Sequence, residues 1–506
     1  MTAALDRTFS SLRVPNYRRY FVGQVVSISG NWMQIVAEMW LIVQLTGSGT
    51  AVGVTAGLQF LPVLLFGAWG GVLADRFDKR ALLGVTQLCM ALPAVALWGL
   101  TAGGAIEAWM VYALVLARGS VNAIDNPTRQ AFVMEMVGAD RVVNAVALNS
   151  VIVHSARIVG PAAAGALIAL AGVAACFAVN AATFLVMLVA LRLMEPALLQ
   201  RGDRVPRAPG QLRAALAYVR RTPALRIPLA MMVVAGTVSF NFQVLLPLLA
   251  AQTWHGSAAT YALLTASMGV GSVLGALAAG ARGRVTPRIL TGAAALFGCA
   301  ELLVALAPSL PLQAIALVPL GAASVTFAAG VNSSLQLAAA PALRGRVMAL
   351  YSIVFLGSTP IGAPLVGWLA EVAGPRSGLY AGAAAALAAG AYARYAFARA
   401  AAAAPRVGAA PARRSDAVAD VVVDRVEQPA AEAGAVALHR RRREAAAGQL
   451  DDPDAPPAPD QDAGPGVAVV VGDRRGPVVG GVEEPAAEPD PVRRHHRRGE
   501  RRAGRL

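Results

Sequence analysis

Long apolar windows recur along residues 18–400 and constrain the fold more than any other feature of this sequence. Each holds 18 or more mostly apolar residues, enough for a helix to cross a hydrocarbon core about 30 Å thick. Only 14% of the residues are charged, against about a quarter in a soluble domain. The sequence therefore predicts an all-α membrane protein with twelve transmembrane helices, at residues 19–45, 51–74, 81–101, 107–125, 143–168, 172–194, 226–251, 258–281, 286–307, 311–335, 346–370 and 376–399.

Basic residues gather in every second loop between the windows. Loop 75–80 holds three of them, loop 195–225 holds six arginines, and the alternate loops hold almost none. Loops rich in arginine and lysine stay in the cytoplasm. Both termini are therefore expected on the cytoplasmic side of a bacterial inner membrane, with the lipid bilayer as a partner. Nucleic-acid binding also explains a net charge of +15, but loop topology explains it better, so no nucleic-acid partner is expected.

The long central loop separates two halves that resemble each other weakly. Segment 71–74 recurs as 275–278 with glycine, leucine and alanine in the same places, as expected of an internal duplication around a central pathway. After residue 400 the chain lacks aromatic residues and is rich in alanine, proline and charge, which predicts disorder. We therefore expect an N-terminal six-helix half, a cytoplasmic linker with an amphipathic helix, a C-terminal six-helix half and a disordered tail, at residues 1–194, 195–225, 226–400 and 401–506.

The segment Gly71–Arg80 carries the most specific pattern in the chain, GVLADRFDKR. It resembles motif A of the major facilitator superfamily, G-x-L-a-D-r-x-G-r-[kr], at the end of the second predicted span, where that family carries it. The resemblance implies the major facilitator fold, with twelve helices in two pseudo-symmetric six-helix bundles. Asp78 stands where the commonest form of the motif has glycine, and this departure concerns the geometry of the turn.

Motif A implies a gate on the cytoplasmic side. Its glycine allows helices to approach closely, and its carboxylate suits the positive N-terminal end of a helix. By family resemblance that helix is the eleventh, beginning near Arg346. The alternative is that the basic residues only set the topology. The contact of this carboxylate with the helix end would act as a latch that holds the cytoplasmic side closed. Segment 275–284 has no carboxylate, so the latch is expected in one half only. The gate residues are Gly71, Asp75, Arg76, Lys79 and Arg80.

Segments 123–132, 144–150 and 156–161 resemble the branch of the superfamily that contains bacterial drug, macrolide and siderophore exporters. The likeness covers roughly residues 12–400. Within it, small residues resemble the core of the antiporter motif C and imply tight packing between the halves, although ordinary helix packing uses such residues too. These residues are Gly160, Pro161 and Gly165.

Few ionisable residues lie in or beside the predicted spans, where a charge is costly and usually functional. We expect Glu38 to bind a proton or a cationic substrate and Arg118 to modulate its proton affinity. A static ion pair or an outward-facing Glu38 is the alternative. Asp125 is either a helix cap or a functional carboxylate, since Pro127 favours a helix start. The candidates for proton coupling are Glu38, Arg118, Asp125 and Arg157.

Polar and aromatic side chains are sparse in the spans that line the cavity in this superfamily. Aromatic and amide groups together suit large amphiphilic organic molecules better than phosphates or simple ions, although packing explains them equally well. The substrate-cavity candidates are Asn31, Trp32, Gln34, Asn122, Phe240, Asn241 and Gln243.

Other function classes find no support in the sequence. It has no phosphate-binding loop, no metal-ligand cluster and no nucleophile–base spacing, so no enzyme activity, metal or cofactor is expected. The energy must come from an ion gradient, with the proton gradient as the expected source, or from the gradient of the substrate itself. We expect a monomeric secondary active efflux transporter that moves a small-molecule substrate by proton antiport and alternating access. An importer of the same fold and a non-transporting membrane scaffold or sensor are the alternatives.

Overall fold

Helices account for every regular element in the described part of the chain. The computed structural model describes residues 10–138, 140–200, 211–282 and 285–403, which belong to one compact unit. These residues form α-helices, short 3-10 turns and one π-helical turn, with no strand among them. The all-α prediction is therefore confirmed. The predicted disordered tail lies outside the described residues from 404 onward.

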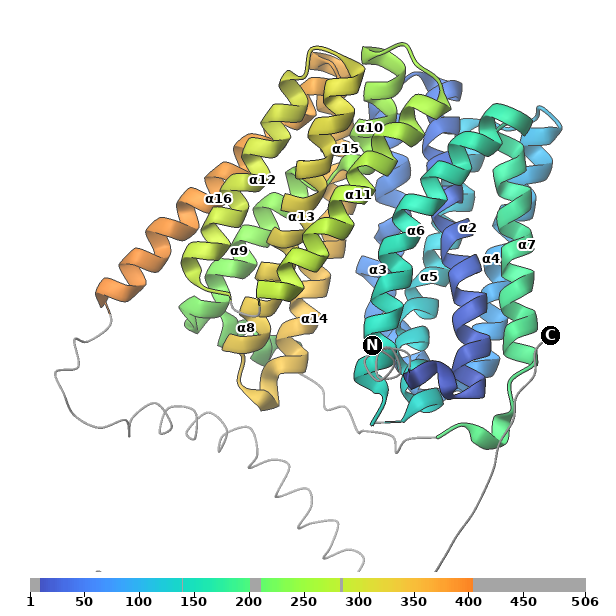
Figure 1. The fold of residues 1–506 in the computed structure, drawn as a ribbon, viewed down its shortest axis with the longest axis horizontal. Helices are drawn as coiled ribbons and strands as arrows, with labels where there is room; N and C mark the ends of the chain where they lie inside the picture. Colours follow the sequence, from blue (N-terminus) through green and yellow to red (C-terminus); the bar gives the residue numbers. More distant parts are fainter. Residues whose placement is uncertain (1–9, 139, 201–210, 283–284, 404–506) are drawn as a thin grey trace, which may run out of the picture. The chain divides into compact units, whose positions relative to one another are not determined.

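Two bundles of helices lie side by side (Figure 1). The first consists of α2 (Pro15–Thr46), α3 (Gly49–Arg76), α4 (Lys79–Ala102), α5 (Ala108–Val137), α6 (Val142–Ala171) and α7 (Val173–Arg192), with the turns η1 (Ser10–Arg13) before it and η2 (Pro196–Leu198) after it. The second consists of α9 (Pro223–Val238), α10 (Phe242–Leu248), the π-helical turn η3 (Leu249–Thr253), α11 (Ala258–Arg282), α12 (Pro287–Leu306), α13 (Leu310–Ala338), α14 (Pro341–Gly357), α15 (Thr359–Ala373) and α16 (Pro375–Ala403). Helix α8 (Gln211–Arg221) lies between them in the chain.

Nine helical segments of the described residues are long and apolar enough to cross a membrane. The other predicted spans, at 19–45, 107–125 and 376–399, are also helical but do not belong to this group. Helices therefore cover every predicted span, while the total of twelve crossings stays a prediction.

Helix α5 is longer than the sequence predicts. The predicted span ends at residue 125, but the helix continues to Val137 with Pro127 inside it. Proline removes the hydrogen bond to the carbonyl four residues earlier, which here belongs to Ala123. Gly70 of α3 packs directly against that carbonyl, where a methyl group would collide. The predicted loop after this span is therefore mostly helix.

Two predicted spans are each broken near the middle. The seventh divides into α9 and α10 at residues 239–241, and the eleventh divides into α14 and α15 at Ser358. At the first break, the side-chain amide of Asn241 donates to the carbonyl oxygens of Thr237 and Val238 at 2.7 and 3.0 Å. Backbone polar groups at membrane depth need partners inside the protein, so this amide stabilises the break.

The halves meet along two helix pairs, α3 with α15 and α6 with α11. Small residues make the closest contacts. Gly53 lies against the backbone of Ala363, and Gly165 lies against Ala262. A methyl group at either glycine would collide with its neighbour. Contacts between small residues hold helices together in a bilayer, where the hydrophobic effect does not drive them to associate.

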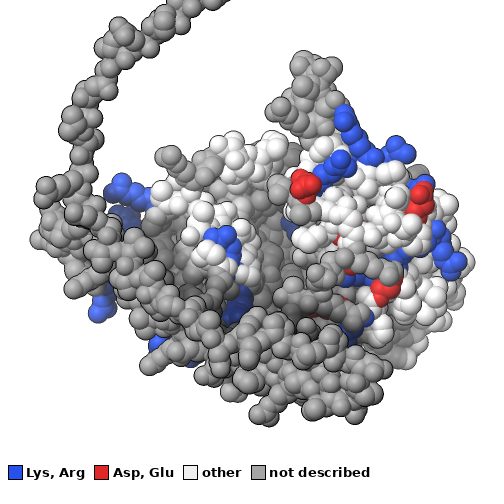
Figure 2. Space-filling view, turned by 90° about the horizontal axis from the view of Figure 1, so that it is seen from below, with Lys and Arg blue, Asp and Glu red and all other residues white. Residues whose placement is uncertain are grey.

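The two ends of the bundle are named here for reference. The basic end carries the turn from α3 to α4, with Arg76 and Lys79, and the end of α8, with Arg220 and Arg221. Figure 2 shows the molecule from below, with lysine and arginine side chains at several places on this face. The far end carries the turn from α2 to α3 at Gly47.

Candidate functional site

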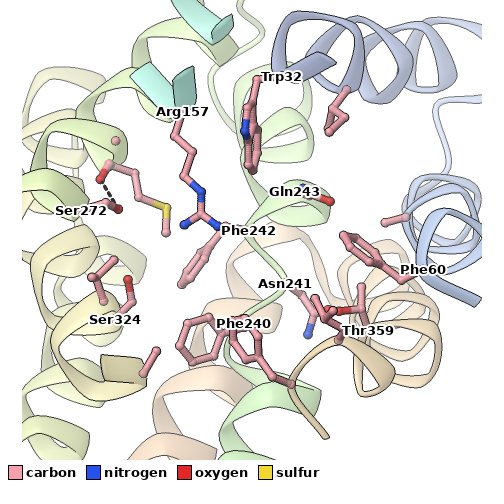
Figure 3. A pocket seen from close by; sticks show the side chains of 18 of the residues that line it. Trp32, Phe60, Arg157, Phe240, Asn241, Phe242, Gln243, Ser272, Ser324 and Thr359 are labelled. Atoms are coloured by element: carbon pink, nitrogen blue, oxygen red, sulfur yellow. Dashed lines mark hydrogen bonds between the residues drawn. The ribbon is translucent and has the colours of Figure 1, made fainter. Parts of the chain in front are cut away.

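A cavity of about 780 Å³ lies between the two halves (Figure 3). Its walls come from α2, α3, α5 and α6 of the first half and from α10, α11, α13, α14 and α15 of the second. A volume of this order suits one drug-sized organic molecule. At the far end the halves touch, with Gly49 against the backbone of Gly367.

Most of the predicted cavity residues line this space. They are Asn31, Trp32, Asn122, Phe240, Asn241 and Gln243. Gln34 does not, since it is fully buried and hydrogen-bonded within the first half. The phase of α2 explains the difference. Residues 31 and 35 lie on one stripe of the helix and face the cavity, while residues 34 and 38 lie on the next stripe and face the interior of the bundle.

An aromatic cluster forms the wall of the second half. The ring centroid of Phe240 lies 5.0 Å from that of Phe297 and 5.6 Å from that of Phe355. Tyr351 stacks on Phe355 at 5.9 Å and also lines the cavity. Flat apolar rings favour ligands with apolar or aromatic bodies. Of these residues only Phe240 was predicted, because the others come from separate helices that the sequence does not relate.

Glu38 and Arg118 form a buried ion pair behind the cavity wall. The guanidinium NH2 of Arg118 donates to Glu38 Oε2 at 2.7 Å, and Gln34 donates to Glu38 Oε1 at 2.7 Å. Arg118 is 4% exposed and Glu38 is 0% exposed, and neither lines the cavity. Asn31, which does line it, accepts from the NH1 of Arg118 at 3.1 Å. One polar side chain therefore connects the cavity to the pair.

The buried pair continues to helix α7, which the sequence analysis did not consider. Asn180 donates its side-chain amide to Gln34 Oε1, and Thr183 donates its hydroxyl to Asn180 Oδ1 at 2.8 Å. Both residues are buried. The available signal was an amide and a hydroxyl three residues apart in an otherwise apolar span.

Asp125 lies in the middle of α5 and is not a helix cap. That alternative is wrong because the helix continues through Pro127. Asp125 pairs with Arg129 one turn later and accepts from Thr86 Oγ1 at 2.6 Å and Gln87 Nε2 at 2.9 Å. Such a network stabilises the packing of α4 on α5, in the half of the bundle near the basic end.

Motif A residues organise the basic end of the first half. Asp78 caps α4 by accepting from the backbone N–H of Ala81 at 2.9 Å, which explains a carboxylate where the motif usually has glycine. Lys79 pairs with Glu135 of α5 at 2.6 Å. Arg80 donates to the final carbonyls of α7, with Nε 2.7 Å from the oxygen of Leu191, where a cation is favoured.

The remaining gate residues occupy the end of α3. Asp75 and Arg76 are exposed, and Gly71 is half-buried. The predicted partner helix begins at Pro341, five residues before the expected Arg346. A closed contact between Asp75 and this helix stays a prediction.

The motif C residues serve two different contacts on α6. Gly160 is buried against Trp32 and Met33 of α2, inside the first half, while Gly165 lies against Ala262 of α11 in the other half. Pro161 lies within the continuous helix. The segment therefore packs closely on both sides at the level of the cavity.

Hydrogen bonds join the halves at the far end. Glu371, near the end of α15, accepts from Ser48 Oγ at 2.6 Å and from the backbone N–H of Thr50 at 2.8 Å. Gln252 donates to the carbonyl of Gly47 at 2.8 Å. The first N–H groups of a helix lack partners within the helix and favour an anion. Glu371 therefore caps α3 from the opposite half.

Two other features bear on the chemistry of the site. Among the described residues, no group of histidine, cysteine and acidic side chains could hold a metal ion. Arg157, a predicted coupling residue, lines the cavity on α6, whereas the other three predicted coupling residues are buried in the two networks above.

Comparison with known proteins identifies a group of relatives. The family model for transmembrane secretion effectors, MFS_3, matches residues 6–424. The staphyloferrin A transporter of Staphylococcus aureus is 24% identical over 54% of this chain and 66% of its own length. Macrolide efflux protein A of Streptococcus pyogenes is 24% identical over 69% and 88%, and the enterobactin exporter EntS of Citrobacter koseri is 27% identical over 71% and 86%. The chain spans 48% and 66% of the length of the first relatives it matches.

Solved structures give the same picture of the fold. A bacterial homologue of the human lysosomal transporter Spinster, in an inward-facing and unoccupied conformation, matches with a TM-score of 0.59 and 15% identity. The match covers 76% of this chain and 96% of that chain. This likeness establishes the predicted fold.

Proposed function

Since the chain belongs to the transmembrane secretion effector family of the major facilitator superfamily, we propose that it is a proton-coupled exporter of amphiphilic organic compounds. Membership makes it a multi-pass membrane transporter and not an enzyme. The observation that carries the proposal is the cavity of about 780 Å³ between the halves, lined by rings and amides. Efflux relatives that handle macrolides and siderophores support export.

Alternating access is supported by the contacts of α3 with α15. At the far end, Glu371 caps α3 and holds the halves together. At the basic end, Asp75 lies on the same helix α3 and is proposed to cap α14 when that end closes. A rocking motion of rigid halves closes one end as it opens the other. One helix pair then carries a carboxylate latch at each end, and only one latch is closed at a time.

The position of Asn31 supports proton coupling through Glu38. Asn31 lines the cavity and also accepts a hydrogen bond from Arg118. A substrate that donates to Asn31 competes with Arg118 for this acceptor, so its binding can move the guanidinium that holds Glu38. When that movement separates Arg118 from Glu38, the carboxylate is free to take a proton from the opposite side of the membrane. In this scheme the membrane potential contributes about 2.3 kcal/mol per charge for each 100 mV.

The orientation of the protein follows from its charge. Arginine and lysine side chains gather at the basic end, and such residues favour the cytoplasm. We therefore place the basic end and both termini in the cytoplasm. Since hydrogen bonds join the halves at the far end, we propose that the cavity opens at the basic end and collects substrate from inside the cell.

A drug panel in living cells tests the proposal. Cells that express the chain and cells with an empty vector are exposed to macrolides, cationic dyes and siderophores, and accumulation is measured with and without an uncoupler. We expect lower accumulation of at least one compound, with the difference lost when the proton gradient collapses. Higher accumulation would instead identify an importer, and identical accumulation of every compound would favour the non-transporting scaffold.

A further inference from the structure

Arg157 extends from the middle of α6 into the cavity (Figure 3). Its guanidinium carbon lies 5.1 Å from the centroid of the Trp32 ring, and the side chain points toward Phe242 and Gln243. Its Nε is buried and has no hydrogen-bond partner among the described residues. The side chain therefore presents donor groups to a space enclosed by rings and amides.

No described carboxylate neutralises this cation. Arg157 is the one charged residue among the described residues that line the cavity, and it belongs to none of the ion pairs found in that part of the chain. Glu38 and Asp125 on α2 and α5 are each engaged with another arginine. Glu301 is buried against α16, away from the cavity. The cavity of the transporter is therefore positively charged.

An unpaired cation at membrane depth is destabilising. The stacked ring of Trp32 offsets only part of this, because a cation–π contact is weaker than an ion pair. The half-buried position also restricts the water that solvates the guanidinium. A counter-ion supplied from outside the chain would satisfy Arg157 better than any described neighbour does.

The surroundings define the chemistry of that counter-ion. A guanidinium offers a planar fork of N–H donors that matches the two oxygens of an oxyanion. Trp32 and Phe242 supply apolar rings beside the charge, and Asn31 and Gln243 supply neutral polar groups. A simple inorganic anion would leave the rings unused, whereas an anionic group on an aromatic or aliphatic body uses both.

We propose that Arg157 binds the anionic group of the substrate, so that the exported compounds are amphiphiles with a carboxylate, sulfonate or similar oxyanion on an apolar body. This rests on the proposed export through the same cavity. It replaces the expectation that Glu38 attracts a cationic substrate, because Glu38 is already paired and lies behind the wall. Cationic amphiphiles meet an uncompensated like charge and are disfavoured.

The test compares two probes that share one body. Anilinonaphthalene sulfonate carries an anionic group, and phenylnaphthylamine has the same rings without it. Each is titrated into the purified full chain in lipid nanodiscs, with binding to empty nanodiscs subtracted. The variants are Arg157→Gln, Arg157→Lys and the matched control Arg288→Gln, whose arginine is exposed at the start of α12 outside the cavity.

We expect Arg157→Gln to weaken sulfonate binding about tenfold, the size of one lost charge-assisted contact, and to leave amine binding within about twofold. Arg157→Lys should keep part of the sulfonate affinity, and Arg288→Gln should change neither probe. Equal losses for both probes, or unchanged sulfonate binding, would overturn the proposal. The binding titration needs no proton gradient, so its result does not depend on export. If the chain prefers the sulfonate in nanodiscs but exports nothing from cells, that result counts against the proposed function alone.

Discussion

At the scale of single residues, two kinds of charged side chain bear on the proposed transport. Glu38 and Asp125 are buried and paired with arginines of their own half, so their charges stabilise the packing of that half. Arg157 lines the cavity and has no described counter-ion. Ion pairs inside one half are preserved when rigid halves rock, whereas a charge on the cavity wall changes its surroundings. A coupling role for Glu38 therefore requires that a substrate bound at Asn31 change the hydrogen bonds of the Glu38–Arg118 pair.

Replacing Glu38 by glutamine tests this requirement. Removing one partner of a buried ion pair costs about 3–5 kcal/mol, so we expect Glu38→Gln to lower the thermal unfolding temperature and to abolish substrate-driven proton flux. The double variant Glu38→Gln with Arg118→Gln should recover stability, because no charge stays unpaired, but not proton flux. Flux is measured with a pH-sensitive dye in everted vesicles.

The control is Glu107→Gln, since Glu107 is exposed at the start of α5. Its unfolding temperature and its proton flux should match those of the wild type. Proton flux at the wild-type level in the stable double variant would remove Glu38 from the coupling mechanism and leave it a structural residue.

At the scale of helices, the far-end latch depends on how α3 begins. Gly47 ends α2 in a left-handed conformation with φ +63°, and Ser48 then caps α3 by accepting from the N–H of Ala51. The next free N–H, that of Thr50, points out of the helix end and meets Glu371 of α15. The sequence analysis expected a latch from motif A alone, because Glu371 belongs to no pattern that relates it to α3.

Replacing Glu371 by glutamine should loosen the far end. Loss of the charge weakens two hydrogen bonds and the interaction with the helix end by about 1–2 kcal/mol in total. We expect the outward-open state to become roughly 5–30 times more populated. The measurement is the rate at which an impermeant thiol reagent, added from outside, labels Val36→Cys on the cavity wall, in a background without the natural cysteines. Glu107→Gln is again the matched control, and equal labelling rates in all three proteins would show that Glu371 does not hold the far end.

At the scale of the whole molecule, the two halves touch through small residues along α3–α15 and α6–α11. Contacts between small residues leave few side chains to repack when the helices shift. Each half can therefore tilt against the other as a rigid unit. The ion-pair networks of the first half lie inside that half and stiffen it. This division into a stiff half and a seam of small residues supports the proposed transport by rocking.

A reversible cross-link across the far end tests the rocking motion. Cysteines at Ser48 and Glu371, in a chain whose Cys89, Cys176 and Cys299 are replaced, can be joined by a short cleavable thiol cross-linker, because the two side chains are in contact. We expect export to stop and to recover after cleavage, while probe binding to the cavity is retained. Treatment with the cross-linker should not change the export rate of either single-cysteine chain. Full export by the cross-linked protein would exclude opening at the far end.

Local patterns in the sequence were enough to predict which segments of the chain form the membrane helices. Crossing a bilayer requires about twenty apolar residues in a row, and this property is readable without any knowledge of neighbours. The departure at Asp78 was readable as a change in the turn after α3, but not as the cap of α4. The superfamily was readable because motif A is contiguous in the chain.

Only the tertiary structure decided which side chains meet. Asn31 faces the cavity and Gln34 does not, because the rotation of α2 is set by the helices around it. Gly70 of α3 packs against the carbonyl of Ala123 in α5, a contact between helices that no local pattern indicates. The cap of α3 by Glu371 joins residues that are 321 positions apart. Apolar length is a property of one segment, whereas helix rotation, ion pairing and the charge of the cavity arise from packing between segments.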